Sequence, residues 1–142
     1  MSSDNGQVAV RFVESFGRGD AEAARACLAS GATTIAKGFG QLSGPRSFEL
    51  IVATTNAFKD VMPSGLRPDF KTVTSEGDRV VVEFEGNAVL ANGEDYRNQY
   101  CLVFTLRDGL ITNVNEYYCT LLADAKVLPL LADVEAQRHA AG

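Results

Sequence analysis

Four polar side chains in the last third of the sequence could together carry out acid–base chemistry: Asn98, Tyr100, Glu116 and Tyr118. Asn98 and Tyr100 are two positions apart, so they point to the same face of any β-strand that contains both. A carboxylate on an apolar wall can act as a general base, and a phenol beside it can donate a hydrogen bond to a developing oxyanion. One such residue alone would most often be structural, so the functional interpretation depends on the whole group.

Other common catalytic groups are scarce. The only histidine, His139, lies in a polar tail, which argues against a Ser-His-Asp triad or a histidine-based metal site in the core. The cysteines, Cys27, Cys101 and Cys119, are odd in number and lack CxxC spacing, so we expect neither disulfides nor a zinc site. We interpret Cys119 as a packed, inert thiol. The glycine-rich stretch 38–44 lacks the context of a phosphate-binding loop. We therefore predict no metal and no cofactor.

The composition limits the classes of function further. The chain has 142 residues, 46% hydrophobic and 22% charged, and we expect one domain over residues 1–142. A net charge of −5 without any basic run argues against a nucleic-acid partner. No apolar run approaches the roughly 20 residues of a membrane helix, and the first residues do not form a signal peptide. We therefore expect a cytoplasmic protein with no membrane partner.

Helical periodicity dominates the first half. An apolar residue at every fourth position from Val8 to Phe16 predicts a helix that ends at Gly17. Asp20 is placed to cap a second helix, which we expect to reach about residue 30. Pro45 suits the first turn of a third helix, where its missing N–H costs nothing.

The second half changes to a period of two. The alternation predicts strands over 66–75, 79–90, 96–106 and 110–119, with a shorter strand over 33–36. Three helices followed by a four-stranded meander predict an α+β fold: a curved antiparallel sheet forms a cone, and the three N-terminal helices pack on its concave face. The C-terminal segment is helix-prone, but Pro129 predicts that the helix is broken or short.

Strand pairing determines which polar residues face the inside. A five-residue loop over 91–95 would pair Ala88 with Asn98 and Gly86 with Tyr100. This register leaves the glutamates of the preceding strand on the outer face, whereas a one-residue shift would bury them.

In the last strand, the alternation of side chains does not place all the expected inner residues on one face. Ile111 fits one face and Glu116 the other, and a β-bulge near residues 112–113 would place both inside. Counted without a bulge, a three-residue turn places Glu116 opposite Tyr100. Whether Glu116 or Tyr117 faces the pocket stays open at this point.

Several segments carry a resemblance to a known family: FVESFGRGD (12–20), GEDYRNQY (93–100), FTLRDGLI (104–111) and EYYCT (116–120). With these motifs the chain, from Val8 to about Leu122, resembles the SnoaL-like, ketosteroid isomerase-related branch of the nuclear-transport-factor-two-like superfamily. The resemblance implies a cone of curved sheet and three helices, often paired into a homodimer through the outer sheet face. Family members include isomerases, polyketide cyclases, epoxide hydrolases and binding proteins.

The chain also departs from its relatives at functional positions. Phe12 stands where ketosteroid isomerases carry a tyrosine, and Ala36 where they carry a base aspartate. Cys119 replaces an aspartate that is frequent in related sequences, and the Arg-x-Asp set of the epoxide hydrolases is missing. An epoxide hydrolase-like activity is therefore an alternative only.

Two hypotheses for function follow. In the first, the protein is an isomerase, cyclase or lyase for a hydrophobic carbonyl compound: Glu116 is the base, Tyr100 donates to the oxyanion and Asn98 orients the substrate. The residues expected to contact the substrate are Tyr118, Phe12, Phe58, Phe84 and Phe104. In the second, the same pocket binds a hydrophobic small molecule without transforming it. A third possibility, an interaction domain, predicts a filled pocket.

The outer sheet face predicts a homodimer. Its expected members mix apolar and charged types: Val81, Val89, Cys101, Val103 and Thr105 among Glu83, Glu85, Arg97 and Gln99. This face is too apolar to be wholly exposed to water, so a second copy is expected to cover it. The alternative is that segment 127–131 of the same chain folds over it.

Overall fold

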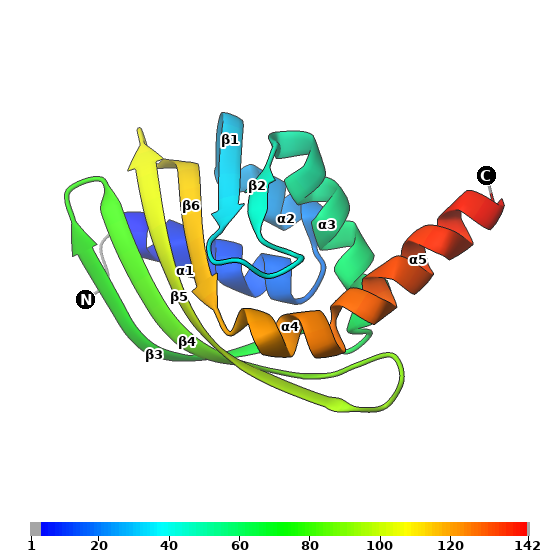
Figure 1. The fold of residues 1–142 in the computed structure, drawn as a ribbon. Helices are drawn as coiled ribbons and strands as arrows, with labels where there is room; N and C mark the ends of the chain where they lie inside the picture. The colour runs from blue at the N-terminus through cyan, green and yellow to red at the C-terminus, as the bar shows by residue number, and fades with distance from the viewer. Residues whose placement is uncertain (1–3, 142) are drawn as a thin grey trace.

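The curved sheet and the helices that fill it are arranged as an open cone (Figure 1). The computed structural model describes residues 4–141, and side chains as far as Gln137. The helices are α1 (Asp4–Gly17), α2 (Ala21–Ala26), α3 (Phe48–Val61), α4 (Thr120–Lys126) and α5 (Leu128–Ala141). The strands are β1 (Leu28–Ala36), β2 (Gly44–Arg46), β3 (Arg67–Glu76), β4 (Arg79–Val89), β5 (Asp95–Arg107) and β6 (Leu110–Tyr118).

The six strands form one sheet in the order β2-β1-β6-β5-β4-β3. Strands β3 to β6 are the predicted antiparallel meander, and β1 adds to it in parallel with β6. The sheet curves around α1, and α2 and α3 cover the same concave side (Figure 1). The predicted α+β cone is therefore confirmed, with a parallel edge that the alternation did not reveal.

Two apolar clusters hold the helices to the sheet. The larger one packs α1 on the middle of the sheet, and Phe12 and Phe104 are among its members. The smaller one joins the end of α3 to the β4–β5 hairpin and the C-terminal helices, through Val61, Leu90 and Val127. Tyr100 packs against both clusters, so its ring lies where the two halves of the interior meet.

The second helix is shorter than predicted, and the strand after it is longer. Asp20 caps α2 as expected, since its carboxylate accepts from the Ala23 N–H at 3.1 Å. The helix ends at Ala26, not near residue 30, because the next carbonyl accepts from the Ile111 N–H at 2.9 Å. Leu28 then pairs with Ile111 and starts β1. Cross-strand pairing overrides the local helical pattern here.

The predicted start of the third helix at Pro45 is wrong. Pro45 lies in β2, where it pairs with Ile35 of β1. Helix α3 begins at Phe48, and Ser47 is its N-cap, accepting from the Leu50 N–H at 3.3 Å. A proline is tolerated in β2 because the strand is at the edge of the sheet and needs no ladder donor on its free side.

The β4–β5 register differs from the prediction by two residues. Gly86 pairs with Asn98 and Ala88 with Tyr96. The loop is two residues shorter than predicted, because the Leu90 N–H donates to the Glu94 carbonyl at 2.8 Å and leaves only residues 91–93 between them. A shift of two keeps every side chain on its predicted face, and the outer position of the β4 glutamates is unchanged.

The bulge predicted in the last strand is confirmed. Thr105 pairs with Asn113 and Leu106 with Ile111, so Thr112 is the extra residue. Ile111 and Glu116 therefore both lie on the inner side, whereas Tyr117 is 46% exposed.

The pairing counted without a bulge is wrong. A two-residue turn, in which Asp108 and Gly109 both have positive φ, joins the strands. Together with the bulge it sets Tyr118 opposite Tyr100 and moves Glu116 opposite Leu102.

The C-terminal segment is broken, as Pro129 predicts, between α4 and α5. Val127 and Leu131 line the interior, which contradicts the alternative that this segment covers the outer sheet face. The side chain of His139 lies outside the described part of the chain. No helix within residues 4–141 is long and apolar enough to cross a membrane.

Candidate functional site

An internal cavity of about 90 Å³ lies between the sheet and the helices. Its wall is largely apolar, with side chains from α1, α3 and the C-terminal helices. The polar groups in the wall come mainly from strands: Thr34, Arg46, Tyr96, Tyr100, Glu116 and Tyr118. A cavity of this kind, apolar with a few convergent polar groups, is typical of a small-molecule site, and it disfavours the pure interaction domain.

Four of the five residues expected to contact a ligand line this cavity: Tyr118, Phe12, Phe58 and Phe84. Phe84 stacks on the Tyr100 ring with 4.8 Å between centroids and 5° between planes. Phe104, in contrast, is fully buried behind the wall, where it contacts the edge of Phe12 at 6.0 Å. Phe104 is therefore a core residue that packs against Phe12.

Two phenols on β5 form a hydrogen-bonded chain. The Tyr96 and Tyr100 hydroxyl oxygens are 2.9 Å apart, and the Asn98 amide nitrogen donates to the Tyr96 oxygen at 2.8 Å. Tyr96 is 2% exposed, and either of the two hydroxyl groups can be the donor of the bond between them. When Tyr96 donates, the Tyr100 proton is left for a group in the cavity.

Burial keeps these phenols protonated. Loss of solvation is the main cause that raises the pKa of Tyr96, and it raises the pKa of Tyr100 well above the ordinary value of 10.0. Tyr118 faces Tyr100 at 5.6 Å between ring centroids, and burial, with the nearby Glu116 charge, raises its pKa to about 12. All three are hydrogen-bond donors at neutral pH.

The structure gives Asn98 a different place from the one predicted. Its side-chain oxygen accepts from the N–H groups of Gln99 and Cys119, at 2.8 and 3.2 Å. Its nitrogen donates to Tyr96 and to the Cys119 carbonyl, at 2.8 and 3.1 Å. Every donor and acceptor of the amide is thus occupied. Asn98 does not line the cavity; it ties the end of β6 to β5 and holds Tyr96.

Cys119 is also placed differently, because its thiol side chain is exposed instead of packed. Only its backbone takes part in the site, through the two hydrogen bonds to Asn98. Among the residues that the structure describes, no group of three or more His, Cys, Asp and Glu side chains could hold a metal ion.

Glu116 faces the cavity from β6 and is half-buried. Loss of solvation raises the pKa of its carboxyl group above the ordinary value of 4.5. The positive charge of Arg46 and a hydrogen bond from the buried Thr34 hydroxyl oppose this rise in pKa. A carboxylate with a raised pKa in an apolar cavity is suited to accept a proton from a weak acid.

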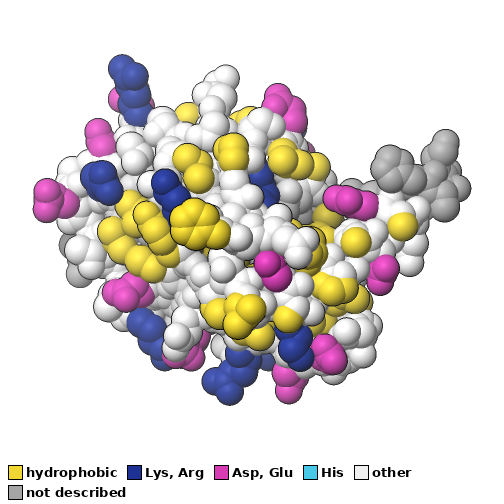
Figure 2. Space-filling model, in the orientation of Figure 1, with side chains coloured by type: hydrophobic (Ala, Val, Ile, Leu, Met, Phe, Trp, Pro, Cys, Tyr) yellow, Lys and Arg dark blue, Asp and Glu magenta, His cyan; other side chains and the backbone are white. Residues whose placement is uncertain are grey.

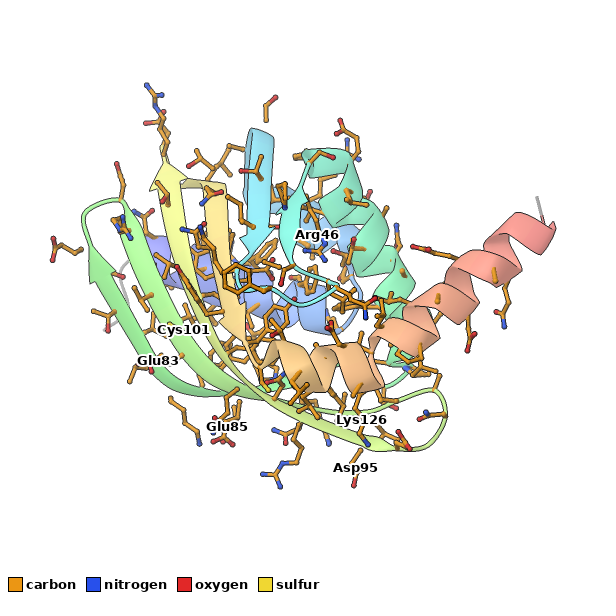
Figure 3. All side chains as sticks on the ribbon, in the orientation of Figure 1. Arg46, Glu83, Glu85, Asp95, Cys101 and Lys126 are labelled. Carbon is orange, nitrogen blue, oxygen red and sulfur yellow. The ribbon has the colours of Figure 1, made fainter. Side chains whose placement is uncertain are left out.

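Arg46 is the charged residue of the site that the sequence analysis missed. It lies on β2 beside α3, on the inner side of the sheet edge (Figure 3), and its guanidinium donates to the Leu42 carbonyl at 2.8 Å. Thr34 of β1 pairs with Arg46, and Ala36 of β1 pairs with Glu116. β1 therefore brings the two charges to the same wall. The three residues of β2 are too few to show a period, so no sequence signal marked Arg46.

The chain resembles known proteins along most of its length. Residues 9–114 match the SnoaL-like domain. A candidate polyketide cyclase from Xanthomonas campestris pv. campestris has a TM-score of 0.72 at 26% identity, covering 87% of this chain and 96% of that one. A candidate SnoaL-like polyketide cyclase from Jannaschia sp. CCS1 has a TM-score of 0.69 at 19% identity, covering 87% and 90%. An NTF2-like protein of unknown function from Burkholderia pseudomallei K96243 has a TM-score of 0.72 at 19% identity, covering 92% and 98%. No curated protein matches the chain.

Proposed function

Since the chain belongs to the SnoaL-like domain family, as its motifs suggested, we propose that it is a cofactor-independent isomerase, cyclase or lyase acting on a hydrophobic carbonyl compound. The observation that carries this proposal is that Glu116 and Tyr100 line the same apolar cavity. One is a carboxylate whose pKa is raised by burial, and the other is a phenol that burial keeps protonated.

The proposed reaction begins with transfer of a proton from a C–H next to the carbonyl to the Glu116 carboxylate. The C–H electron pair moves toward the carbonyl oxygen, and the resulting enolate accepts a hydrogen bond from Tyr100. Tyr96 supports Tyr100 from behind. Glu116 then returns the proton to another carbon or to a leaving oxygen, so it ends the cycle ionised.

The test is exchange of the acidic C–H with D₂O, followed by NMR on a panel of hydrophobic ketones (2-tetralone, phenylacetone and benzoylacetone). We expect Glu116→Gln to lower the exchange rate by about 10²–10⁴-fold, the usual contribution of a positioned base. Glu83→Gln is the matched control, because Glu83 is exposed on the outer sheet face (Figure 3). Unchanged exchange in Glu116→Gln would remove this residue from the mechanism.

The second candidate function is ligand binding without turnover. It is favoured by Ala36, which lies directly beside Glu116 on the neighbouring strand and offers no second carboxylate. On this hypothesis the wild-type protein binds members of the panel in a thermal-shift assay but exchanges none of them. Exchange of any member above the buffer rate decides for the enzyme.

We also propose that a second copy covers the outer sheet face. Val81 and Val103 pair directly across β4 and β5 and are half-buried. Figure 2 shows hydrophobic side chains gathered over these strands with charged side chains around them. Light scattering at micromolar concentration is expected to give a dimer mass, and Val103→Asp to give a monomer. A monomer mass for the wild type would contradict the proposal.

We propose a cytoplasmic location because the cysteines of the chain are not expected to form disulfides. The three cysteines are free thiols, and the Cys27 thiol is buried and has a pKa raised by burial. Alkylation of cell extracts under non-reducing conditions should modify the exposed Cys119 completely. A mixed disulfide at Cys119 in freshly lysed cells would argue for an oxidising compartment.

A further inference from the structure

The cavity wall carries two side chains of opposite charge. Of the described residues that line it, only Arg46 and Glu116 carry a charge. The two come from strands that flank β1 on its two sides. Both are half-buried. Charges in an apolar surrounding are costly unless they are compensated. The Arg46 charge lowers the pKa of Glu116, but loss of solvation raises that pKa by more, so the compensation of the carboxylate is incomplete.

Protonation of Glu116 would leave the Arg46 guanidinium as the one charged side chain among the described residues of the wall. The hydrogen bond that the structure records for Arg46 goes to the Leu42 carbonyl, which is neutral. A guanidinium binds oxygen anions well, since it presents several donors in one plane. We propose that the cavity takes its ligand as the anion of a hydrophobic oxygen acid, a carboxylate or an enolate, which Arg46 binds while Glu116 takes up one proton.

This inference rests on the proposed function, because an enolate made by Glu116 is itself such an anion and forms at the moment when Glu116 becomes neutral. The negative charge near Arg46 then lies on the enolate instead of on the Glu116 carboxylate. A stable acid of similar shape reproduces this state without any reaction. Arg46 is thus a specificity-determining residue for the ionised form of the ligand.

Glu116 is the titratable group of the described wall whose charge can change on ligand binding, because loss of solvation raises the pKa of its carboxyl group. The other titratable groups in the described cavity wall are Tyr96, Tyr100 and Tyr118, whose raised pKa values keep them neutral. The side chains that α1 and α3 contribute to the wall are apolar or hydroxyl-bearing, and Asp124 of α4 acts on Tyr118 from outside it. Affinity for an anion should therefore rise as the pH falls, up to tenfold per unit for one bound proton.

Calorimetry with four acids and their primary amides tests the proposal: benzoate, phenylacetate, cinnamate and 2-naphthoate. At pH 6 to 8, in two buffers of different ionisation enthalpy, at least one acid should bind more tightly than its amide. Its binding should take up close to one proton at pH 8 and weaken with rising pH. The amides have the same shape without the charge, so their affinity should not depend on pH.

Three variants separate the two charges. Glu116→Gln should bind the acid at pH 8 more tightly than wild type and without proton uptake. Arg46→Met should lose at least tenfold in acid affinity and keep its amide affinity, and Arg46→Lys should retain part of the acid affinity. Arg107→Met is the matched control, since it removes an exposed positive charge at the far end of β5 and should change nothing.

The inference is overturned if none of the four acids binds at millimolar concentration, if the amides bind as tightly as the acids, or if proton uptake persists in Glu116→Gln. If Arg46→Met does not fold, the gain of affinity in Glu116→Gln decides alone. The proposed function fails by a different measurement, the loss of D₂O exchange, so the two failures are distinguishable.

Discussion

The two polar walls of the cavity are built in different ways. On β5, in the interior of the sheet, Asn98, Tyr96 and Tyr100 form a chain of hydrogen bonds of 2.8 and 2.9 Å in which the buried groups are satisfied. At the opposite edge, Arg46 stands on a strand of three residues and faces a carboxylate whose charge depends on pH. The β5 wall supplies a hydrogen-bond donor, Tyr100, that stays protonated. The opposite wall supplies Glu116, whose charge can change. Proton transfer needs both.

After loss of the Glu116 base, removal of the Tyr100 donor should have the largest effect on exchange. Tyr100→Phe keeps the ring stacked on Phe84 but deletes the hydroxyl. We expect the D₂O exchange rate to fall by about 10²–10³-fold, the usual loss of one oxyanion donor. Tyr117→Phe, on the exposed side of β6, is the control. Exchange within twofold of wild type in Tyr100→Phe would show that the phenol chain is only structural.

Asn98→Ala tests whether the β5 wall is held from behind. The substitution strands the Cys119 N–H and carbonyl and removes the donor to Tyr96. We expect a loss of about 2–3 kcal/mol in the free energy of unfolding, as for buried polar groups left without partners. Urea denaturation measures it. Asn87→Ala, which removes an exposed hydrogen bond to Arg97, should lower the free energy of unfolding far less. Equal losses in the two variants would show that Asn98 does not hold β6 to β5.

The charged wall predicts a pH-dependent stability. The folded-state pKa of Glu116 lies above 4.5, so its protonation favours the folded state. That contribution is fully present below the unfolded pKa and is lost as the pH rises through the folded pKa. Glu116→Gln should therefore raise the Tm relative to wild type at pH 8, and the difference should vanish near pH 4. A constant difference in Tm across this range would contradict the assignment.

Thr34→Val should have the smallest effect. The Thr34 hydroxyl bonds the Glu116 carboxylate and lowers its pKa, so its loss raises that pKa further. The basic form is then reached at higher pH, and the rising limb of the exchange–pH profile should shift upward with less than a tenfold loss at pH 8. Thr33→Val, an exposed neighbour, is the control. A shift in the opposite direction would exclude the hydrogen bond as the cause.

Much of this arrangement was determined by the sequence alone. The period of two in strands β3 to β6 assigns each side chain to a face whatever the pairing, because side chains alternate along any extended strand. The parity conflict between Ile111 and Glu116 predicted the bulge, since both could face inward only if one residue were extra. The aromatic residues Phe12 and Phe58 were likewise assigned to the interior by helical spacing.

Only the tertiary structure decided the rest. A register shift of two leaves the alternation unchanged, so the pairing of Asn98 with Gly86 had no local signal. The saturation of the Asn98 amide depends on Cys119, 21 residues away, which reaches it only after the sheet has formed. Arg46 enters the cavity because a strand without a detectable period adds to the edge of β1. Pairing partners that are distant in sequence decide such features, and local periodicity carries no information about them.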